Sequence, residues 1–380
     1  MKRYPSSLLL AFAVAFCNMG AYRSSKLVVA LFAAHLGADA MDVGVIVSLY
    51  ALVPLMLAVY AGRITDRLGM VGPIVGGTAG VVLGLLVPWL WPGLPGLYVS
   101  AGLLGGSYVF YHVAIQKLVG TISTPETRSQ NFAAYSMVLA VATFVGPLVF
   151  GYSIDQVGHP RTYLFIAAMA LTTIILLLAF KAVLPARARS GEEHGGPVFD
   201  LLANPGLRRA LITSGVILTG IDLFSFYLPI YGHQIGLSAT VIGRIIAMFA
   251  LASFVVRVAM PRLVAMSSEE RVLGWSLAVS GGTYLLFPFF TDAWILAAIA
   301  FVLGLGLGCG QPLSMMLTYM RAPPGRSGEA LGLRLTVNHF SHVVVPLVFG
   351  AIGTAFGLAP VFWINAAFLA GGGFLTRRRA

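Results

Sequence analysis

One short polar stretch decides the fold of this chain: it reads Gly62-Arg63-Ile64-Thr65-Asp66-Arg67-Leu68-Gly69 and follows a long apolar segment. Its glycines permit a tight turn. Asp66 can sit at the N-terminus of a helix, where the helix dipole favours an anion, and Arg67 can hold a neighbouring helix end through charge-assisted hydrogen bonds. We therefore interpret the stretch as a polar loop between two long apolar helices.

The composition places these helices in a membrane. Only 10% of the 380 residues are charged and 58% are hydrophobic, whereas soluble domains carry about 25% charged residues. So few charges could not cover a water-soluble globule, which excludes a cytosolic enzyme, a nucleic-acid-binding protein and a disordered chain. The two cysteines, Cys17 and Cys309, lie in apolar runs, so we expect neither a disulfide framework nor a zinc site.

The apolar segments predict an all-α membrane protein of twelve transmembrane helices in two pseudo-symmetric six-helix bundles. A spanning helix needs roughly 20 apolar residues. Segments of this kind are 7–35, 42–62, 70–91, 96–118, 131–152, 161–183, 208–233, 240–262, 271–291, 294–319, 329–352 and 357–375. The longest polar stretch divides them into equal halves, which predicts an N-terminal bundle (1–183), a cytoplasmic linker (184–207) and a C-terminal bundle (208–380).

The cations predict the orientation. With the N-terminus in the cytoplasm, Lys and Arg concentrate in the inner loops and at the inner helix ends. The exceptions are Arg23, Lys26, Arg161, Arg244 and Arg334. This bias explains the net charge of +11 as a topology signal, without nucleic acid. We expect a multi-pass protein of a cell membrane, such as a bacterial inner membrane, with both termini in the cytoplasm.

The stretch 62–69 resembles the signature Gly-x-x-x-Asp-Arg-x-Gly of the major facilitator superfamily. Gly62, Asp66, Arg67 and Gly69 occupy its fixed positions; the alternative is an ordinary polar turn. The family's fold implies two bundles that rock against each other. It also implies a central cavity, lined by the segments 7–35, 96–118, 208–233 and 294–319. The resemblance indicates a transport mechanism and leaves the substrate open.

A second stretch, Gly146-Pro147-Leu148-Val149-Phe150-Gly151, is similar to the element Gly-Pro-x-x-Gly-Gly of the family's drug/proton antiporters, although Phe150 departs from it. Gly-Pro pairs are also common in closely packed membrane helices, so a purely structural kink is the alternative. Those exporters carry an arginine early in the fourth helix. Gly102 stands at that place here, which puts their usual proton relay in doubt.

Two cations lie deep in the first segment. Arg23 is near the middle of 7–35 and Lys26 follows it by one turn on the same face. A charge at bilayer depth is costly, so it faces a cavity or a partner. The alternative is that both side chains extend to the outer interface. We expect Arg23 and Lys26 to bind an anionic group of a substrate.

Asp222 is the one acidic residue that the sequence places at membrane depth, in the segment 208–233. Arg23 and Asp222 have similar positions in equivalent segments of the two halves, so they could form an ion pair. Protonation of Asp222, or an anion at Arg23, would break such a pair and change the conformational balance. The alternative is a fixed structural pair.

Other polar side chains at depth complete the candidate site. Histidine titrates near physiological pH, so His112 is both a candidate proton carrier and a candidate anion donor, or simply a hydrogen-bonded interhelical residue. The remaining candidates for substrate binding are Tyr108, Tyr111, Ser225, Tyr227, Gln311, Asn338 and His342. Asn338 and His342 are second-tier candidates, because their segment packs less centrally in this fold.

We find no sequence signature of an enzyme, a cofactor or a metal site. There is no P-loop, no Ser-His-Asp grouping on one predicted face and no metal-ligand spacing. We therefore expect a monomeric secondary transporter in the lipid bilayer. It would move a small anionic or zwitterionic organic solute by alternating access, in proton-coupled export. The alternatives are uptake of an organic anion by proton symport and, from another class, a non-transporting membrane receptor or assembly subunit.

Overall fold

The computed structural model describes residues 5–38, 40–184 and 197–377, and every regular element in these ranges is a helix. The elements of the first half are α1 (Ser6–His35), α2 (Ala40–Leu68), α3 (Val71–Leu90), α4 (Leu94–Ile122), α5 (Arg128–Val157), α6 (His159–Ala179) and the 3₁₀ turn η1 (Lys181–Val183). Those of the second half are α7 (Phe199–Ala203), α8 (Pro205–Gln234), α9 (Ala239–Met266), α10 (Glu269–Leu286), η2 (Phe287–Phe289), α11 (Ala293–Gly308), α12 (Gly310–Arg321), α13 (Ser327–Phe356) and α14 (Leu358–Arg377). The predicted all-α class is confirmed.

The described helices account for the predicted membrane spans. Ten segments are long and apolar enough to cross a membrane, and α11 and α12 together form one of them. Two further helices, α1 with 30 residues and α4 with 29, are equally long but carry polar side chains in their middles. These two helices lie where the sequence predicts the remaining spans.

The stretch 62–69 is not the loop that the sequence predicts. Helix α2 continues to Leu68, and the turn to α3 consists only of Gly69 and Met70. Gly69 has a φ of 83°, in the left-handed region that favours glycine. The prediction of a loop is wrong because polarity marks where a chain leaves the membrane, and a helix can extend past that point.

The predicted helix 294–319 is interrupted at Cys309, between α11 and α12. Four alternate glycines precede or follow the break, namely Gly304, Gly306, Gly308 and Gly310. Arg257 of α9 donates from Nε to the Gly308 carbonyl oxygen at 2.9 Å. The side chain thus satisfies a carbonyl group at the end of α11, as an interruption inside a membrane requires.

The chain divides into two compact units. The first unit contains Met1–Pro125, Tyr135–Val198 and Ala322–Thr336, and the second contains Glu126–Ala134, Phe199–Arg321 and Val337–Ala380. The boundary at 198 and 199 falls inside the predicted linker 184–207, of which residues 185–196 lie outside the described residues. By these contacts the first turns of α5 belong to the second unit, and the first turns of α13 belong to the first.

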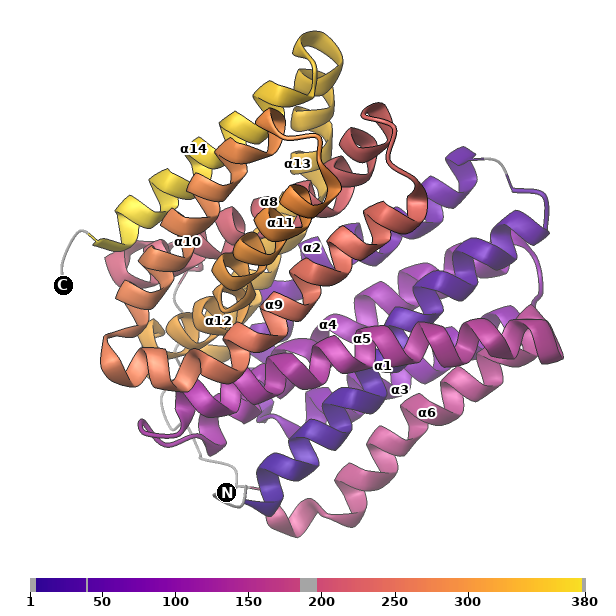
Figure 1. Ribbon diagram of the computed structural model, residues 1–380. Coiled ribbons are helices and arrows are strands. Elements are labelled where there is room, and N and C mark those ends of the chain that lie inside the picture. The colour runs from indigo at the N-terminus through magenta and orange to yellow at the C-terminus, as the bar shows by residue number, and fades with distance from the viewer. Residues whose placement is uncertain (1–4, 39, 185–196, 378–380) are drawn as a thin grey trace. The chain divides into compact units, whose positions relative to one another are not determined.

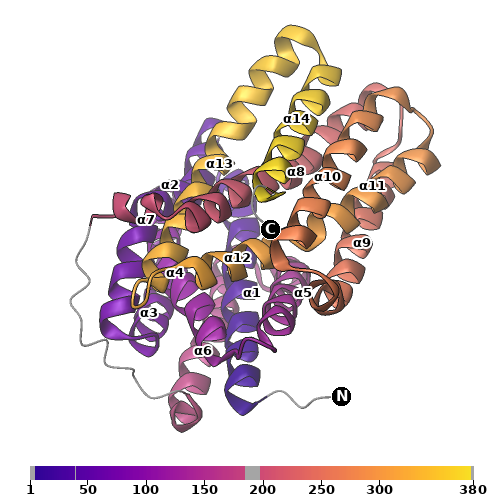
Figure 2. The same ribbon diagram turned by 90° about the vertical axis from the view of Figure 1, so that its left-hand side faces the viewer.

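Each unit has its own helix packing. In the first unit α4 packs against α2 and α3, while α6 packs against α1 and α3 (Figure 1). In the second unit α9 packs against α11, α10 against α14, and α8 against α12 and α14 (Figure 2). The side chains of Tyr111 in α4 and Tyr284 in α10 are fully buried.

Two glycines of α4 test this packing. A Cβ atom at Gly105 would lie 2.7 Å from the Leu49 carbonyl oxygen of α2, whereas one at Gly102 would meet no atom within 4 Å. Overpacking costs about 1–3 kcal/mol, while alanine favours a helix over glycine by about 1 kcal/mol. We expect Gly105→Ala to lower the unfolding temperature in detergent and Gly102→Ala to maintain or raise it. Equal destabilisation of the two variants would contradict the packing of α4 on α2.

Candidate functional site

Asp66 binds the beginning of α13 within the first unit. Its carboxylate accepts hydrogen bonds from the backbone N–H groups of Gly328 and Glu329, each at 2.8 Å. On its other side Asp66 Oδ1 lies 2.6 Å from Lys117 Nζ of α4. The first N–H groups of a helix have no partner inside the helix and carry its positive dipole end. Asp66 therefore caps α13 from a different helix.

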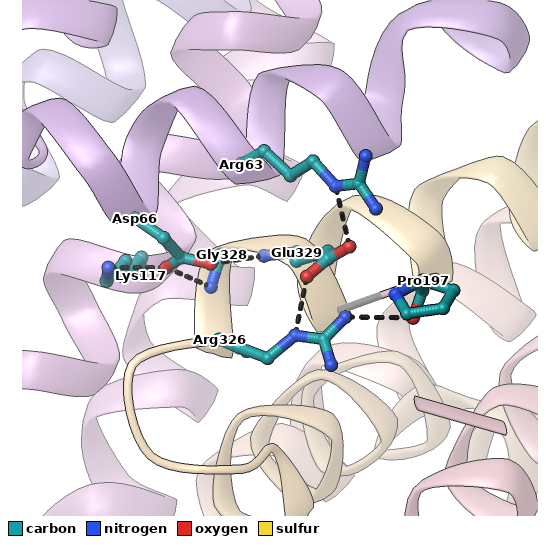
Figure 3. A network of polar contacts seen from close by, with 7 residues as sticks. All are labelled: Arg63, Asp66, Lys117, Pro197, Arg326, Gly328 and Glu329. Carbon is teal, nitrogen blue, oxygen red and sulfur yellow. Dashed lines mark hydrogen bonds and ion pairs between the residues drawn. The ribbon is translucent and has the colours of Figure 1, made fainter. Parts of the chain in front are cut away.

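Glu329 lies between two arginines in the same network (Figure 3). Its Oε1 is 2.8 Å from Arg63 Nε and its Oε2 is 2.7 Å from Arg326 Nε. Arg326 also donates from Nη2 to the Pro197 carbonyl oxygen at 3.2 Å. Glu329 is only 2% exposed, and a buried carboxylate is stable only when it is paired and hydrogen-bonded in this way.

Glycines bring α2 and α13 close enough for these bonds. A Cβ atom at Gly62 would lie 2.7 Å from Glu329 Cα, and one at Gly332 would lie 3.1 Å from Val59 Cα. Only glycine allows this approach of two backbones. We call the contacts of Asp66, Arg63 and Arg326 with the first turn of α13, together with the ion pair of Lys117 with Asp66, the α13 anchor. Gly62 and Asp66 of the signature take part in it, while Arg67 is exposed on the last turn of α2.

The candidate cations of α1 lie beside a cluster of tyrosines. Lys26 Nζ is 5.2 Å from the ring centroids of both Tyr22 and Tyr50. The Tyr22 ring stacks on that of Tyr108 in α4, with centroids 3.7 Å apart. Arg23 is exposed one turn before Lys26, which is half-buried. The structure thus brings Lys26 and Tyr108 into one cluster, as the sequence suggests.

Two further candidates of α4 lie next to this cluster. The Tyr111 hydroxyl donates to the Val14 carbonyl oxygen at 3.3 Å. The His112 ring lies 5.1 Å from that of Tyr108. Tyr111 is fully buried and His112 is half-buried, so His112 is the more accessible of the two.

A buried cation of the first unit escapes the sequence reasoning. Arg334 of α13 is 2% exposed and donates from Nη2 to Gln116 Oε1 of α4 at 2.9 Å. Sequence position near a helix end suggests an interfacial arginine here, but the first turns of α13 are packed in the first unit. The signal that could have identified it is an arginine inside an otherwise apolar span.

Asp222 of α8 pairs with His342 of α13 in the second unit. The distance from Asp222 Oδ2 to His342 Nδ1 is 2.7 Å, and the side chains are 10% and 43% exposed. Close by in sequence, the Ser214 hydroxyl donates to Asn338 Oδ1 at 2.8 Å. The two second-tier candidates of α13, Asn338 and His342, are therefore the side chains that pair with polar residues of α8. The pair of Arg23 with Asp222 joins the two units and stays a prediction.

The other predicted residues of the second unit have structural contacts. Ser225 is exposed, and its hydroxyl donates to the Ile221 carbonyl oxygen of its own helix at 2.8 Å. Tyr227 is 7% exposed and lies against Gly350 and Gly353 of α13. Gln311 is the second residue of α12, next to the interruption at Cys309.

The Gly-Pro element of α5 lies against α1 in the first unit. A Cβ atom at Gly146 would lie 2.7 Å from the Gly20 carbonyl oxygen and 3.1 Å from Gly20 Cα. Gly146 thus has a packing role. The side chain of Pro147 lies outside the described part of the structure.

Comparison with known proteins identifies the family of this chain. The sequence profile of the Major Facilitator Superfamily matches residues 11–266 and 210–379. The chain belongs to this superfamily. It is therefore a multi-pass membrane transporter and not an enzyme.

Relatives in the superfamily include resistance proteins. The quinolone resistance protein NorA of Staphylococcus aureus (strain COL) is 23% identical over 361 residues, which cover 90% of this chain and 89% of NorA. The tetracycline resistance protein, class C, of Escherichia coli is 24% identical over 361 residues, which cover 89% and 85%. The crystal structure of the human organic anion transporter MFSD10 (TETRAN) matches with a TM-score of 0.77 and 17% identity, covering 98% of this chain and 100% of that one. This structural match shows the common fold alone.

The cap on α13 can be tested by hydrogen exchange. Loss of a helix cap costs about 0.5–2 kcal/mol, which corresponds to a factor of about 2–30 in an opening equilibrium. We expect Asp66→Ala to accelerate amide exchange at Gly328 and Glu329 by such a factor, measured by mass spectrometry in detergent.

The matched control is Asp292→Ala. Asp292 caps α11 by accepting hydrogen bonds from the N–H groups of Trp294 and Ile295, at 2.9 and 3.1 Å. This variant should accelerate exchange in the first turn of α11 and leave that of α13 unchanged. Unchanged exchange at Gly328 and Glu329 in Asp66→Ala would contradict the capping role.

Proposed function

We propose that this transporter exports a small anionic or zwitterionic organic solute in exchange for protons, by alternating access in a bacterial cytoplasmic membrane with both termini inside. The pair of Asp222 with His342 is the observation that carries the proposal. The relatives support export, since their names describe resistance to quinolones and to tetracycline. The pattern of cations supports the orientation.

The Asp222–His342 pair has the properties of a proton-binding site. The carboxylate is sheltered and the imidazole is partly exposed, so a proton can reach the pair through His342. With a neutral imidazole the pair carries one negative charge, and one added proton makes it neutral. A net charge at bilayer depth is costly. Uptake of a proton therefore changes the electrostatic energy of the second unit.

Arg23 and Lys26 supply positive charge for the solute in the first unit. Neither side chain has an ion pair with an acidic residue in the described ranges. A carboxylate or phosphate group would bind such cations by charge-assisted hydrogen bonds. The stacked rings of Tyr22 and Tyr108 form an apolar wall beside them. This arrangement supports an anionic or zwitterionic solute.

The α13 anchor is suited to act as the conformational switch. It consists of ion pairs and helix-end hydrogen bonds, which are directional and are lost when the partners separate. In the proposed cycle, solute and proton bind the two conformations with different affinities and so change their populations. An effect of this kind amounts to about 1–3 kcal/mol, or 5–150-fold in affinity.

The coupling role of Asp222 can be tested in proteoliposomes with an imposed pH gradient. We expect Asp222→Asn to abolish gradient-driven accumulation of a transported solute, because the amide cannot bind the coupled proton. Exchange of labelled for unlabelled solute should persist in part. His342→Gln should reduce accumulation about 5–150-fold, the usual size of a coupling between sites.

Asp292→Asn is the matched control, because asparagine caps a helix as well as aspartate does. It should transport like the unchanged protein. Equal accumulation by Asp222→Asn and the unchanged protein would refute the coupling role. The direction of accumulation distinguishes export by antiport from uptake by symport, and absence of any gradient-dependent movement would refute proton-coupled transport.

A further inference from the structure

Lys26 is held by aromatic rings and not by an acid. Its ammonium group lies 5.2 Å from the ring centroids of both Tyr22 and Tyr50. At this distance a cation is attracted to the face of a ring, and the attraction grows when water is excluded. Tyr22 is 5% exposed and Tyr50 is fully buried. We call these two rings, whose centroids are 5.5 Å apart, together with the ammonium that lies against both of them, the tyrosine cage.

The cage is rigid without Lys26. The Tyr22 hydroxyl donates to the Tyr50 carbonyl oxygen at 3.1 Å, and the Tyr50 hydroxyl donates to Ser25 Oγ at 3.2 Å. Ser25 in turn donates to the Tyr22 carbonyl oxygen at 2.8 Å, and the Tyr22 ring is stacked on Tyr108. None of these contacts uses the ammonium group. The rings are therefore preorganised for a cation, which lowers the cost of binding one.

Lys26 itself is able to leave the cage. Its charge sits at the end of a flexible four-carbon stem, and Arg23 is three residues earlier on the same helix face. The two like charges do not stabilise each other, but both would be attracted to one anionic group. Such a group beside the exposed Arg23 would draw Lys26 out of the cage, provided that another cation takes its place.

We propose that the tyrosine cage is a cation subsite which Lys26 occupies in the solute-free protein. On binding, an ammonium group of the solute replaces the Lys26 ammonium against the two rings, and Lys26 joins Arg23 on the anionic group of the same solute. The site therefore selects zwitterions over simple anions or simple cations. This inference rests on the proposed function, whose solute class it narrows, but its tests measure binding and not transport.

Removal of the lysine side chain tests the cage directly. Lys26→Ala deletes three methylene groups and the ammonium, and n-propylammonium has the same atoms. We expect Lys26→Ala in detergent to bind n-propylammonium at least about tenfold more tightly than Lys26→Met, measured by calorimetry. Methionine fills the same space without a charge, so it serves as the matched control. Lys26→Ala should also bind the neutral analogue n-propanol about tenfold more weakly.

A second substitution assigns the binding to the rings. Lys26→Ala combined with Tyr50→Leu should lose the tight binding of n-propylammonium. Binding by Lys26→Ala that is no tighter than that by Lys26→Met, or that survives Tyr50→Leu, would overturn the proposal.

The protein without substitutions provides an independent test should the variants fail to fold. A membrane-permeant acylating reagent modifies lysines that are not shielded, and peptide mass spectrometry measures each one. We expect betaine, which carries an ammonium and a carboxylate, to increase acylation of Lys26 at about tenfold lower concentration than tetramethylammonium. Acetate should have no such effect. The exposed Lys181 is the internal control and should not change.

Arg23→Gln should remove the advantage of betaine over tetramethylammonium. Equal effects of betaine, tetramethylammonium and acetate on the unchanged protein would overturn the zwitterion subsite. Failure of gradient-driven transport with these binding results intact would refute the proposed function and leave the cage. Gradient-driven transport by a protein that shows no binding at the tyrosine cage would refute the cage and leave the proposed function intact.

Discussion

A charge inside a bilayer must have a partner, and this constraint explains most of the polar structure of the transporter. An unpartnered Arg, Lys or Asp at the centre of a membrane helix costs about 2.5–3.5 kcal/mol. Four buried or half-buried charges in the described residues are stabilised in different ways. Glu329 lies between two arginines, Arg334 donates to an amide, Lys26 lies against two aromatic rings and Asp222 pairs with an imidazole. These contacts differ in how many hydrogen bonds and ion pairs hold each charge: Glu329 has two arginine partners, whereas Asp222 has one imidazole partner.

Helix α13 carries contacts of both kinds, the α13 anchor and the pair of Asp222 with His342. Its first turn is bound by Asp66 and carries Glu329, and further along it carries His342, the partner of Asp222. The separation of Glu329 and His342 along the helix is about 20 Å at 1.5 Å per residue. A change of charge at His342 therefore acts on the same element that the α13 anchor holds. A coupling between two sites needs an element of this kind, whose equilibrium both sites bias.

The sequence predicts the fold well because the spans are long and apolar, and it predicts helix ends poorly. Helix α2 extends through the polar signature to Leu68, since Asp66 finds partners in α4 and α13. The interruption at Cys309 depends on Arg257, which precedes it by 52 positions and belongs to another helix. Apolar periodicity carries no information about such tertiary contacts.

For the candidate site, too, the sequence indicates single charged residues but not their tertiary contacts. Asp222 is conspicuous as a deep acid among apolar residues, so its position alone identifies it. Its partner His342 is 120 positions away, and nothing near either residue in the sequence indicates the pair. Lys26 is likewise conspicuous as a charge, but the sequence predicts only that it binds an anionic group. That two tyrosines surround it follows from the packing of α1 on α2 and α4, which no local pattern encodes.

The pairing of Asp222 with a histidine also bears on Gly102, which stands where the drug/proton antiporter pattern implies an arginine. Arginine stays charged at all physiological pH values, so a carboxylate beside it responds to pH only through its own titration. An imidazole can itself bind and release a proton, so a pair of carboxylate and imidazole offers two proton-binding groups where a pair with arginine offers one. In addition, a Cβ at Gly102 would meet no atom within 4 Å, so packing does not require glycine there and does not explain the lost arginine. The proton site that we propose in α8 and α13 would account for the glycine, because coupling through that site needs no charged group early in α4.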